Sequence, residues 1–373
     1  MEMFFFRPDE YERLYNCNTY RVEDVPLENR QHIYLGIAFL ILFAIFLILY
    51  IPCVIACYRR TRQICYKFLF FIGIIDIACL PVCGFVTGYM AIEGAVFCSH
   101  PTFLYFCGVF GNFCWVTEST TAIILALNRC IEMLSPKLSE QLFHENRTWC
   151  WMCLATLYGF LFVTFTKPVM FNGILCAWFF NPHTGYIEDT EGMYANRPHT
   201  FHNYFVCLAL TGSYLMFIVI FVIKSSMLDN VPAGRPTGSR GAAQRTAFIQ
   251  VAVLSCVNAV GSGIYDYMQF FPIGQIFILV ASYAWLFIHG IPSVIFVTMN
   301  KTIRADCIKM CNNLLGICIK RKIIPYTTTH MSTHTSDNKP HISHHTKTQH
   351  EKSVTGNNSI THAGRNQSFN GAL

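Results

Sequence analysis

The sequence has few charged residues. Only 13% of its 373 residues are Asp, Glu, Lys or Arg, whereas 53% are hydrophobic and 15% are aromatic. An ordinary soluble domain carries about twice that share of charge. The composition therefore excludes such a domain and indicates a polytopic membrane protein. The net charge of +6 is then a signal of membrane topology and not of nucleic-acid binding.

Several other features are lacking. The first 30 residues contain no apolar core of signal-peptide length, so the first apolar span is expected to serve as an uncleaved signal. No internal repeat of the kind that marks many transporters is found. The apolar spans contain neither a Ser elbow nor H-E-x-x-H, and C-x-x-C at 150–153 has no partner ligands, so we expect no enzyme and no metal site.

Seven apolar stretches are long enough to cross a bilayer core of about 30 Å as helices. They cover residues 33–57, 68–90, 102–127, 149–171, 203–223, 246–267 and 275–298. The gaps 58–67, 128–148 and 224–245 hold eleven Lys or Arg, whereas 91–101, 172–202 and 268–274 hold one. The sequence thus predicts an all-α, seven-transmembrane helix bundle with the N-terminus outside and the C-terminus cytoplasmic.

Four regions are predicted from this layout. They are an extracellular head over 1–32, the transmembrane domain over 33–298, an amphipathic helix under the inner leaflet over 299–322, and a disordered cytoplasmic tail over 323–373. The apolar face expected for the amphipathic helix consists of Ile303, Cys307, Cys311, Leu314, Leu315 and Cys318. Its cysteines Cys307, Cys311 and Cys318 are candidate palmitoylation sites.

Three titratable side chains stand inside the predicted spans. Asp76, Glu118 and His289 lie in spans two, three and seven, and they would form one buried cluster if these helices meet. Such a cluster could hold a cation or change protonation between two states. The alternative is a static hydrogen-bond network that locks helix packing.

A second group of polar residues could face a ligand. Asn258, Ser262 and Asp266 recur every four residues on span six, and Tyr105 and Asn112 lie seven apart on span three. With Lys167 near the outer end of span four, they could border one cavity. The alternatives are hydrogen bonds to neighbouring helices and, for Lys167, a side chain that reaches the lipid headgroups.

Arg129 follows Asn128 where the third apolar stretch stops. By itself, a guanidinium at this place could simply extend to lipid phosphates. The layout as a whole, however, resembles a rhodopsin-like G-protein-coupled receptor, in which an Arg at this position locks the inactive state and contacts the G protein. More closely, it resembles the nematode serpentine receptors of class T. The segments that carry this resemblance lie within residues 15–307 and are "YNCNTYRVEDVPLENR", "CYKFLFFIGIIDIACL", "GYMAIEGAVFCSHP", "ILALNRCIEML", "FTKPVMFN", "WFFNPHTGYIED", "HTFHNYF" and "HGIPSVIFVTMNKTIR".

The resemblance implies roles for particular residues. Asn128 and Arg129 match the acid–Arg–Tyr motif, with Asn in place of the acid and Glu132 as a substitute one turn later. Asp76 matches the buried acid of a sodium pocket, so a sodium ion is the one cofactor to consider. Pro292 in "IPSVI" matches the proline of the seventh span. The family also implies a disulfide between Cys98 and Cys176, the alternative being two free thiols.

These implications predict a function. We expect a chemoreceptor of the plasma membrane, compatible with a sensory cilium, that binds an external small molecule and activates a heterotrimeric G protein. The alternative is a membrane transporter or ion channel in which Asp76, Glu118 and His289 relay a proton or cation.

Overall fold

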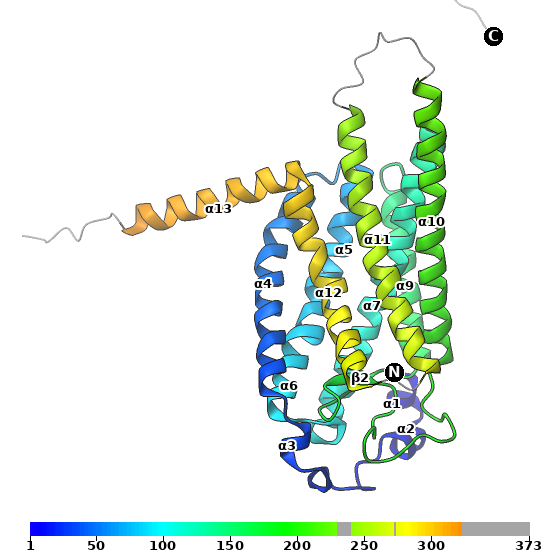
Figure 1. The fold of residues 1–373 in the computed structure, drawn as a ribbon, viewed down its shortest axis with the longest axis vertical. Helices are drawn as coiled ribbons and strands as arrows, with labels where there is room; N and C mark the ends of the chain where they lie inside the picture. Colours follow the sequence, from blue (N-terminus) through cyan, green and yellow to red (C-terminus); the bar gives the residue numbers. More distant parts are fainter. Residues whose placement is uncertain (230–239, 272–273, 323–373) are drawn as a thin grey trace, which may run out of the picture. The chain divides into compact units, whose positions relative to one another are not determined.

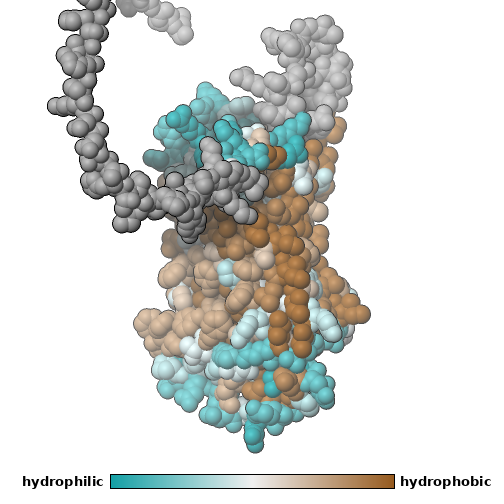
Figure 2. All heavy atoms as spheres, turned by 90° about the vertical axis from the view of Figure 1, so that its left-hand side faces the viewer, coloured by the Kyte–Doolittle hydropathy of each residue, from teal (hydrophilic) through white to brown (hydrophobic). Residues whose placement is uncertain are grey.

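The helix α4 (Ile33–Tyr58) shows how the sequence produces the helical bundle seen in Figure 1. Its 26 residues include no charged side chain. Exposed isoleucines at 37, 41, 45 and 48 recur every three or four residues, which places them on one helical face, while Phe39 and Phe46 are buried on the other. A stripe of exposed isoleucine suits lipid better than water. Figure 2 shows an apolar band on this side of the molecule, with hydrophilic residues gathered at both ends.

Seven long helical segments correspond to the seven predicted spans. The chain is described by a computed structural model for residues 1–229, 240–271 and 274–322. The segments are α4, α5 (Ile64–Leu80) continued by η2 (Pro81–Val86) and α6 (Thr87–Glu93), α7 (Pro101–Leu134), α9 (Arg147–Phe165), α10 (Arg197–Asp229), α11 (Arg240–Phe270) and α12 (Gln275–Met299). By length and apolar composition, six helical segments within the described ranges are able to cross a membrane. The helix α11, which carries Ser, Asn, Gly and Asp, packs against α7, α10 and α12.

Two predicted spans have different ends in the structure. The helix α7 continues through Arg129 to Leu134, because the change in polarity at Asn128 does not interrupt backbone hydrogen bonding. The prediction that the fourth span reaches residue 171 is wrong, because α9 ends at Phe165. The residue before a proline is biased towards extended backbone, and Lys167 precedes Pro168.

The remaining elements lie at the two ends of the bundle. One end carries the head, formed by α1 (Glu2–Phe6), α2 (Pro8–Tyr15), η1 (Val22–Asp24) and α3 (Leu27–Arg30). The same end carries η3 (Phe97–Ser99) and the antiparallel strands β1 (Met170–Asn172) and β2 (Ala177–Phe179), in which Phe171 pairs with Trp178. The other end carries α8 (Pro136–Phe143) and α13 (Lys301–Lys322).

The sharp bend between α12 and α13 is made by Asn300. Its Oδ1 accepts hydrogen bonds from the backbone N–H groups of Thr302 and Ile303, which caps the N-terminus of α13. Ile303 and Cys307 are buried against the bundle, whereas Cys311 is exposed. The apolar face predicted for this helix is therefore divided between the bundle and the surface. The side chains of Leu315 and Cys318, the predicted tail 323–373 and most of the basic gap 224–245 lie outside the described residues.

Candidate functional site

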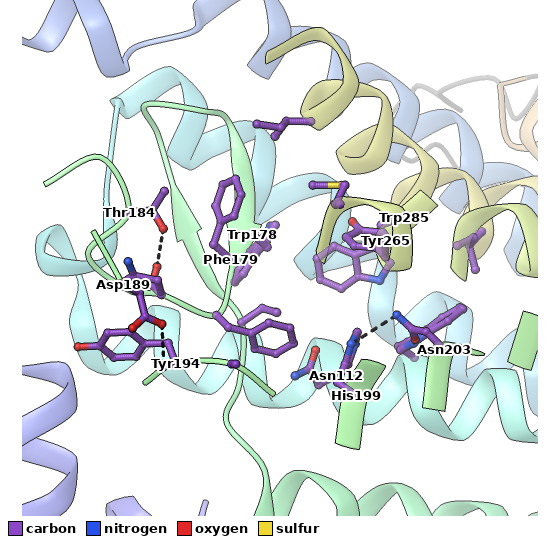
Figure 3. Close-up of a pocket in the computed structure, with 18 residues that line it drawn as sticks. Asn112, Trp178, Phe179, Thr184, Asp189, Tyr194, His199, Asn203, Tyr265 and Trp285 are labelled. Atoms are coloured by element: carbon purple, nitrogen blue, oxygen red, sulfur yellow. Dashed lines mark hydrogen bonds between the residues drawn. The ribbon is translucent and has the colours of Figure 1, made fainter. Parts of the chain in front are cut away.

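A cavity of about 340 Å³ lies at the end of the bundle that carries the head. Side chains of α7, α10, α11 and α12 form its walls, and residues of the β1–β2 hairpin and the loop that follows close it. The volume falls in the range of small-molecule sites, about 300–1,000 Å³. Figure 3 shows Asn112, His199 and Asn203 following one another along one edge, with Thr184, Asp189 and Tyr194 at the far end.

The hairpin that closes the cavity is fixed to three helices. Gly108 of α7 permits the approach, because a Cβ there would lie 1.7 Å from the carbonyl oxygen of Val169. The Nε1 of Trp178 donates to Oγ1 of Thr87, 2.9 Å away on α6, directly after the π-helical turn η2. The Oγ of Ser282 on α12 donates to the carbonyl of Cys176 at 3.2 Å. The hairpin thus forms the roof of the cavity and is held in place by α6, α7 and α12.

A disulfide joins Cys17 of the head to Cys98 of η3, which contacts the first strand of this hairpin. The prediction that Cys98 bonds to Cys176 is wrong. Cys176 is a free, buried thiol beside the second strand of the hairpin, where its backbone is bonded to Ser282. The head is held beside Cys98, because the carbonyl of Leu14 accepts hydrogen bonds from Nε2 of His183 and from the hydroxyl of Tyr194.

The head and the hairpin with the loop that follows it together form a cap over the bundle. Burial in this cap shifts the pKa values of two titratable groups. Desolvation raises the pKa of the Cys176 thiol to about 12, so the thiol stays protonated. Desolvation also lowers the pKa of His183, and the hydrogen bond to Leu14 opposes this shift only in part. A neutral His183 therefore bridges the hairpin loop to the head.

Of the six residues predicted to border a ligand cavity, only Asn112 lines it. Tyr105 is fully buried beneath the head, where Phe4, Tyr11 and Tyr15 surround its ring. The Nζ of Lys167 donates to the carbonyl of Met193, outside the cavity. These two placements correct the prediction. The head covers Tyr105 at the start of α7, and the loop after the hairpin binds Lys167 just after the end of α9.

The predicted polar stripe on α11 faces neighbouring helices and not the cavity. The amide of Asn258 donates to Oε1 of Glu118 at 3.1 Å. Ser262 donates to backbone carbonyls of its own helix. Asp266 is buried beside Asn203 of α10. Periodicity identified the face correctly, but interhelical packing determines what that face meets.

The three titratable side chains of the predicted buried cluster come together. Nδ1 of His289 lies 2.8 Å from Oδ1 of Asp76, and both side chains are fully buried. The hydroxyl of Tyr50 donates to the other oxygen of Asp76. Glu118 is within electrostatic range of both Asp76 and His289, and its Oε2 has no hydrogen-bond partner among the described residues.

This arrangement does not fit a sodium site centred on Asp76. Each carboxylate oxygen of Asp76 is already engaged, one by an imidazole and one by a hydroxyl. Within the described ranges, no three His, Cys, Asp or Glu side chains are placed to hold a metal ion. The residues instead make a buried pair of Asp76 and His289 that joins α5 to α12.

At the opposite end of the bundle, Arg129 is held by its own helix. Its guanidinium lies 2.6 Å from Oε2 of Glu132 and also donates to Oδ1 of Asn128. The amide of Asn128 donates to Oγ of Ser139 on α8 at 3.2 Å. Glu132 thus supplies the carboxylate that pairs with Arg129, and Asn128 connects α7 to α8.

Two further predicted residues have clear positions. Pro292 is buried inside α12, three residues after His289. The thiol of Cys307 is buried 3.9 Å from the thiol of Cys53, which argues against the predicted palmitoylation of Cys307. Cys311 is exposed on α13.

Some residues of the site were missed in the sequence. Trp115, Trp178 and Trp285 line the cavity, as do His199 and Asn203. An aromatic residue in an apolar span gives no signal that separates a cavity wall from ordinary packing. The two polar residues in "HTFHNYF" did offer a signal, because they lie four apart near the start of α10.

The sequence is also similar to known proteins. Residues 1–317 match the family described as serpentine type 7TM GPCR chemoreceptor Srt. Serpentine receptor class T-55 of Caenorhabditis elegans is 23% identical over 256 residues, which are 68% of this chain and 66% of that protein. The match therefore spans slightly less than two thirds of that relative's length. The matched family consists of membrane receptors and not of enzymes. The chain belongs to the Srt family of serpentine seven-transmembrane G-protein-coupled chemoreceptors.

Proposed function

We propose that this chain is a plasma-membrane chemoreceptor that binds an external small molecule in the cavity beneath the hairpin and activates a heterotrimeric G protein through the end that carries Arg129. The head and the hairpin then face the outside, and α8 and α13 face the cytosol. The excess of basic residues in the gaps at the α8 end supports this orientation.

The observation that carries the proposal is the course of α7. Asn112 and Trp115 on this helix line the cavity, Glu118 belongs to the buried polar cluster, and Arg129 lies at the other end. The 17 residues from Asn112 to Arg129 span about 26 Å at 1.5 Å per residue. One helix thus connects a candidate ligand site to a candidate G-protein site.

The mechanism is a shift between two states of the bundle. A ligand that binds the cavity more tightly in one state increases the population of that state. The ion pair of Arg129 with Glu132 is partly exposed and contributes about 1 kcal/mol or less. Such a pair is weak enough to be released when the G protein engages Arg129.

Substitution of Arg129 tests the proposal. Arg129→Ala should abolish agonist-evoked G-protein activation while the receptor still reaches the cell surface, measured by a G-protein dissociation reporter and surface labelling. Arg59→Ala is the matched control, because it removes an exposed charge that directly follows α4 in one of the basic gaps. Normal activation by Arg129→Ala at equal surface level would refute the proposed coupling role.

A second variant tests the restraint on Arg129. Glu132→Gln removes the ion pair and keeps the size of the side chain. We expect up to about a fivefold rise in agonist-independent activity, since about 1 kcal/mol corresponds to that factor. Glu140→Gln, an exposed acid on α8, should leave basal activity unchanged.

Two further roles belong to this proposal. Cys311, the exposed thiol of α13, is the palmitoylation site that the described residues favour. The helix α13 would then lie along the inner leaflet.

A further inference from the structure

The described lining of the cavity offers a ligand no positive charge, and its one negative charge lies at the end away from Asn112. Among its described lining residues there is no Lys or Arg, and Asp189 is the one acid. The two carboxylate oxygens of Asp189 accept the backbone N–H groups of Met193 and Tyr194 at 2.7 and 2.8 Å. Asp189 therefore shapes the loop and is already engaged.

Hydrogen bonding also shows that His199 is neutral. Nε1 of Trp115 donates to Oδ1 of Asn203 at 2.9 Å, which fixes the orientation of the Asn203 amide. The NH₂ group of Asn203 is thereby turned to Nδ1 of His199, 3.4 Å away. Because an amide nitrogen only donates, Nδ1 accepts, and the ring carries its hydrogen on Nε2. The imidazole adds no positive charge to the cavity.

Asn112 supplies an unused hydrogen-bond donor. It lines the cavity, is only 4% exposed, and its Nδ2 has no hydrogen-bond partner among the described residues. A buried donor without a partner is costly, and a ligand acceptor placed against it would remove that cost.

Aromatic faces form the rest of the wall. The rings of Trp178 and Trp285 lie 5.7 Å apart in an edge-to-face arrangement. The indole N–H of Trp178 is used by Thr87, and that of Trp115 by Asn203. These side chains therefore present apolar ring surface to a ligand.

We propose, building on the proposed function, that the cavity selects a small, neutral, aromatic molecule with one hydrogen-bond acceptor, which the amide of Asn112 recognises. An ionised group placed beside Asn112 would be desolvated away from any counter-charge, which is strongly unfavourable, because Asp189, the one acid in the described lining, lies at the far end of the cavity. A pure hydrocarbon would leave the Asn112 donor without a partner.

Four probes of similar size test this selection. Acetophenone carries a neutral acceptor, α-methylstyrene lacks it, benzoate is anionic, and benzylamine is cationic at pH 7. Binding is measured by ligand-observed NMR on the full chain in lipid nanodiscs without G protein. We expect acetophenone to bind about tenfold more tightly than α-methylstyrene, and both ions to bind at least about a hundredfold more weakly than acetophenone.

Two variants separate the role of Asn112 from general packing. Asn112→Leu should bind acetophenone and α-methylstyrene equally, and continued hydrocarbon binding shows that the cavity is intact. Asn112→Asp should lose the preference for acetophenone and gain affinity for benzylamine, so the inference stays testable if the leucine variant does not fold.

Several results would overturn the inference. They are binding of an ion as tight as that of acetophenone, no preference for acetophenone in the wild type, a preserved preference in Asn112→Leu, or no binding of any probe. Because binding is measured without G protein, failure of signalling would leave this inference standing. Activation by a charged molecule bound in the cavity would instead remove the inference and leave the proposed function.

Discussion

At the residue scale, the buried contact between Asp76 and His289 should make a large contribution to the stability of the protein, and substitutions can measure it. His289→Leu leaves the Asp76 carboxylate in the core without its imidazole partner. We expect a loss of about 3–5 kcal/mol in stability, since removal of one member of a buried pair is strongly destabilising. The double variant Asp76→Leu with His289→Leu should be more stable than His289→Leu alone.

Thermal unfolding of the purified receptor measures this coupling. Asp306→Leu is the control, because Asp306 forms a partly exposed ion pair with Arg60 and should contribute about 1 kcal/mol or less. Strict additivity of the two single changes would show that Asp76 and His289 do not act as a pair.

Single residues were predictable where polarity interrupted an apolar stretch. Asp76, Glu118 and His289 were identified in this way, and the structure brings them together. Tyr50, which donates to Asp76, was not identified, because a tyrosine in an apolar helix is unremarkable until its neighbour is known. Tertiary packing determines which side chains meet a buried polar group, so these partners cannot be identified from the local sequence pattern.

At the scale of elements, the cap formed by the head and the hairpin should depend on pH. Its His183 has a lowered pKa when buried and regains about 6.5 when the head detaches. Between these two values the detached state binds more protons at His183, so the contribution of His183 to docking is complete above about pH 6.5 and weakens as the pH falls through that value. Below the pKa of the buried form, the dependence levels off.

Hydrogen exchange of residues 10–20 between pH 7.5 and 5.5 measures that docking. His183→Asn retains a donor for the Leu14 carbonyl but does not titrate in this range. The extra exchange at low pH should therefore be larger in the wild type than in the variant, which retains only the smaller response of the Met1 amine, whose pKa burial lowers to about 6. The same pH response in both proteins would contradict the role of His183.

The disulfide of the cap gives a second prediction at this scale. Cys17→Ala and Cys98→Ala should each free the head, with a loss of roughly 4 kcal/mol for a link that spans 81 residues. Cys176→Ala should have a much smaller effect. Peptide mapping without reduction should recover Cys17 linked to Cys98, and recovery of Cys98 linked to Cys176 would contradict the structure.

Helices were predictable where an apolar stretch of the sequence was long enough to cross a bilayer. The helix α4 was expected over 33–57 and spans Ile33–Tyr58. The hairpin was missed, because each strand has three residues and leaves no periodic pattern. The disulfide could not be assigned either, since Cys17, Cys98 and Cys176 all stood outside the spans and only the docking of the head selects among them.

At the scale of the whole molecule, the proposed orientation can be tested with one substitution. Glu188→Asn creates the glycosylation sequon Asn-Asp-Thr at an exposed position of the loop after the hairpin. We expect this variant to gain one glycan that peptide N-glycosidase removes, measured as a mobility shift. The natural sequon at the exposed Asn146, at the α8 end, should stay unmodified.

A glycan at Asn146 and none in Glu188→Asn would reverse the orientation, and with it the assignment of the ligand end. The number of spans was predictable from apolar length. The direction of the chain stays a prediction from the basic residues in short gaps. The shape of the ligand cavity was not, because it depends on how the hairpin and four helices meet.

The packing of the head also bears on how this receptor can be labelled. Met3 is buried, and Phe4 stacks on Tyr105 of α7, the helix that carries Asn112. A fluorescent protein fused in front of these residues would therefore disturb their packing against α7. Gly192 stands in open space in the loop after the hairpin, with nothing near the position of an added side chain. An epitope inserted there would spare the head, but it would separate Asp189 from the N–H groups of Met193 and Tyr194 and so loosen one end of the ligand site. A label that reports surface delivery must therefore avoid both the first residues of the head and this turn.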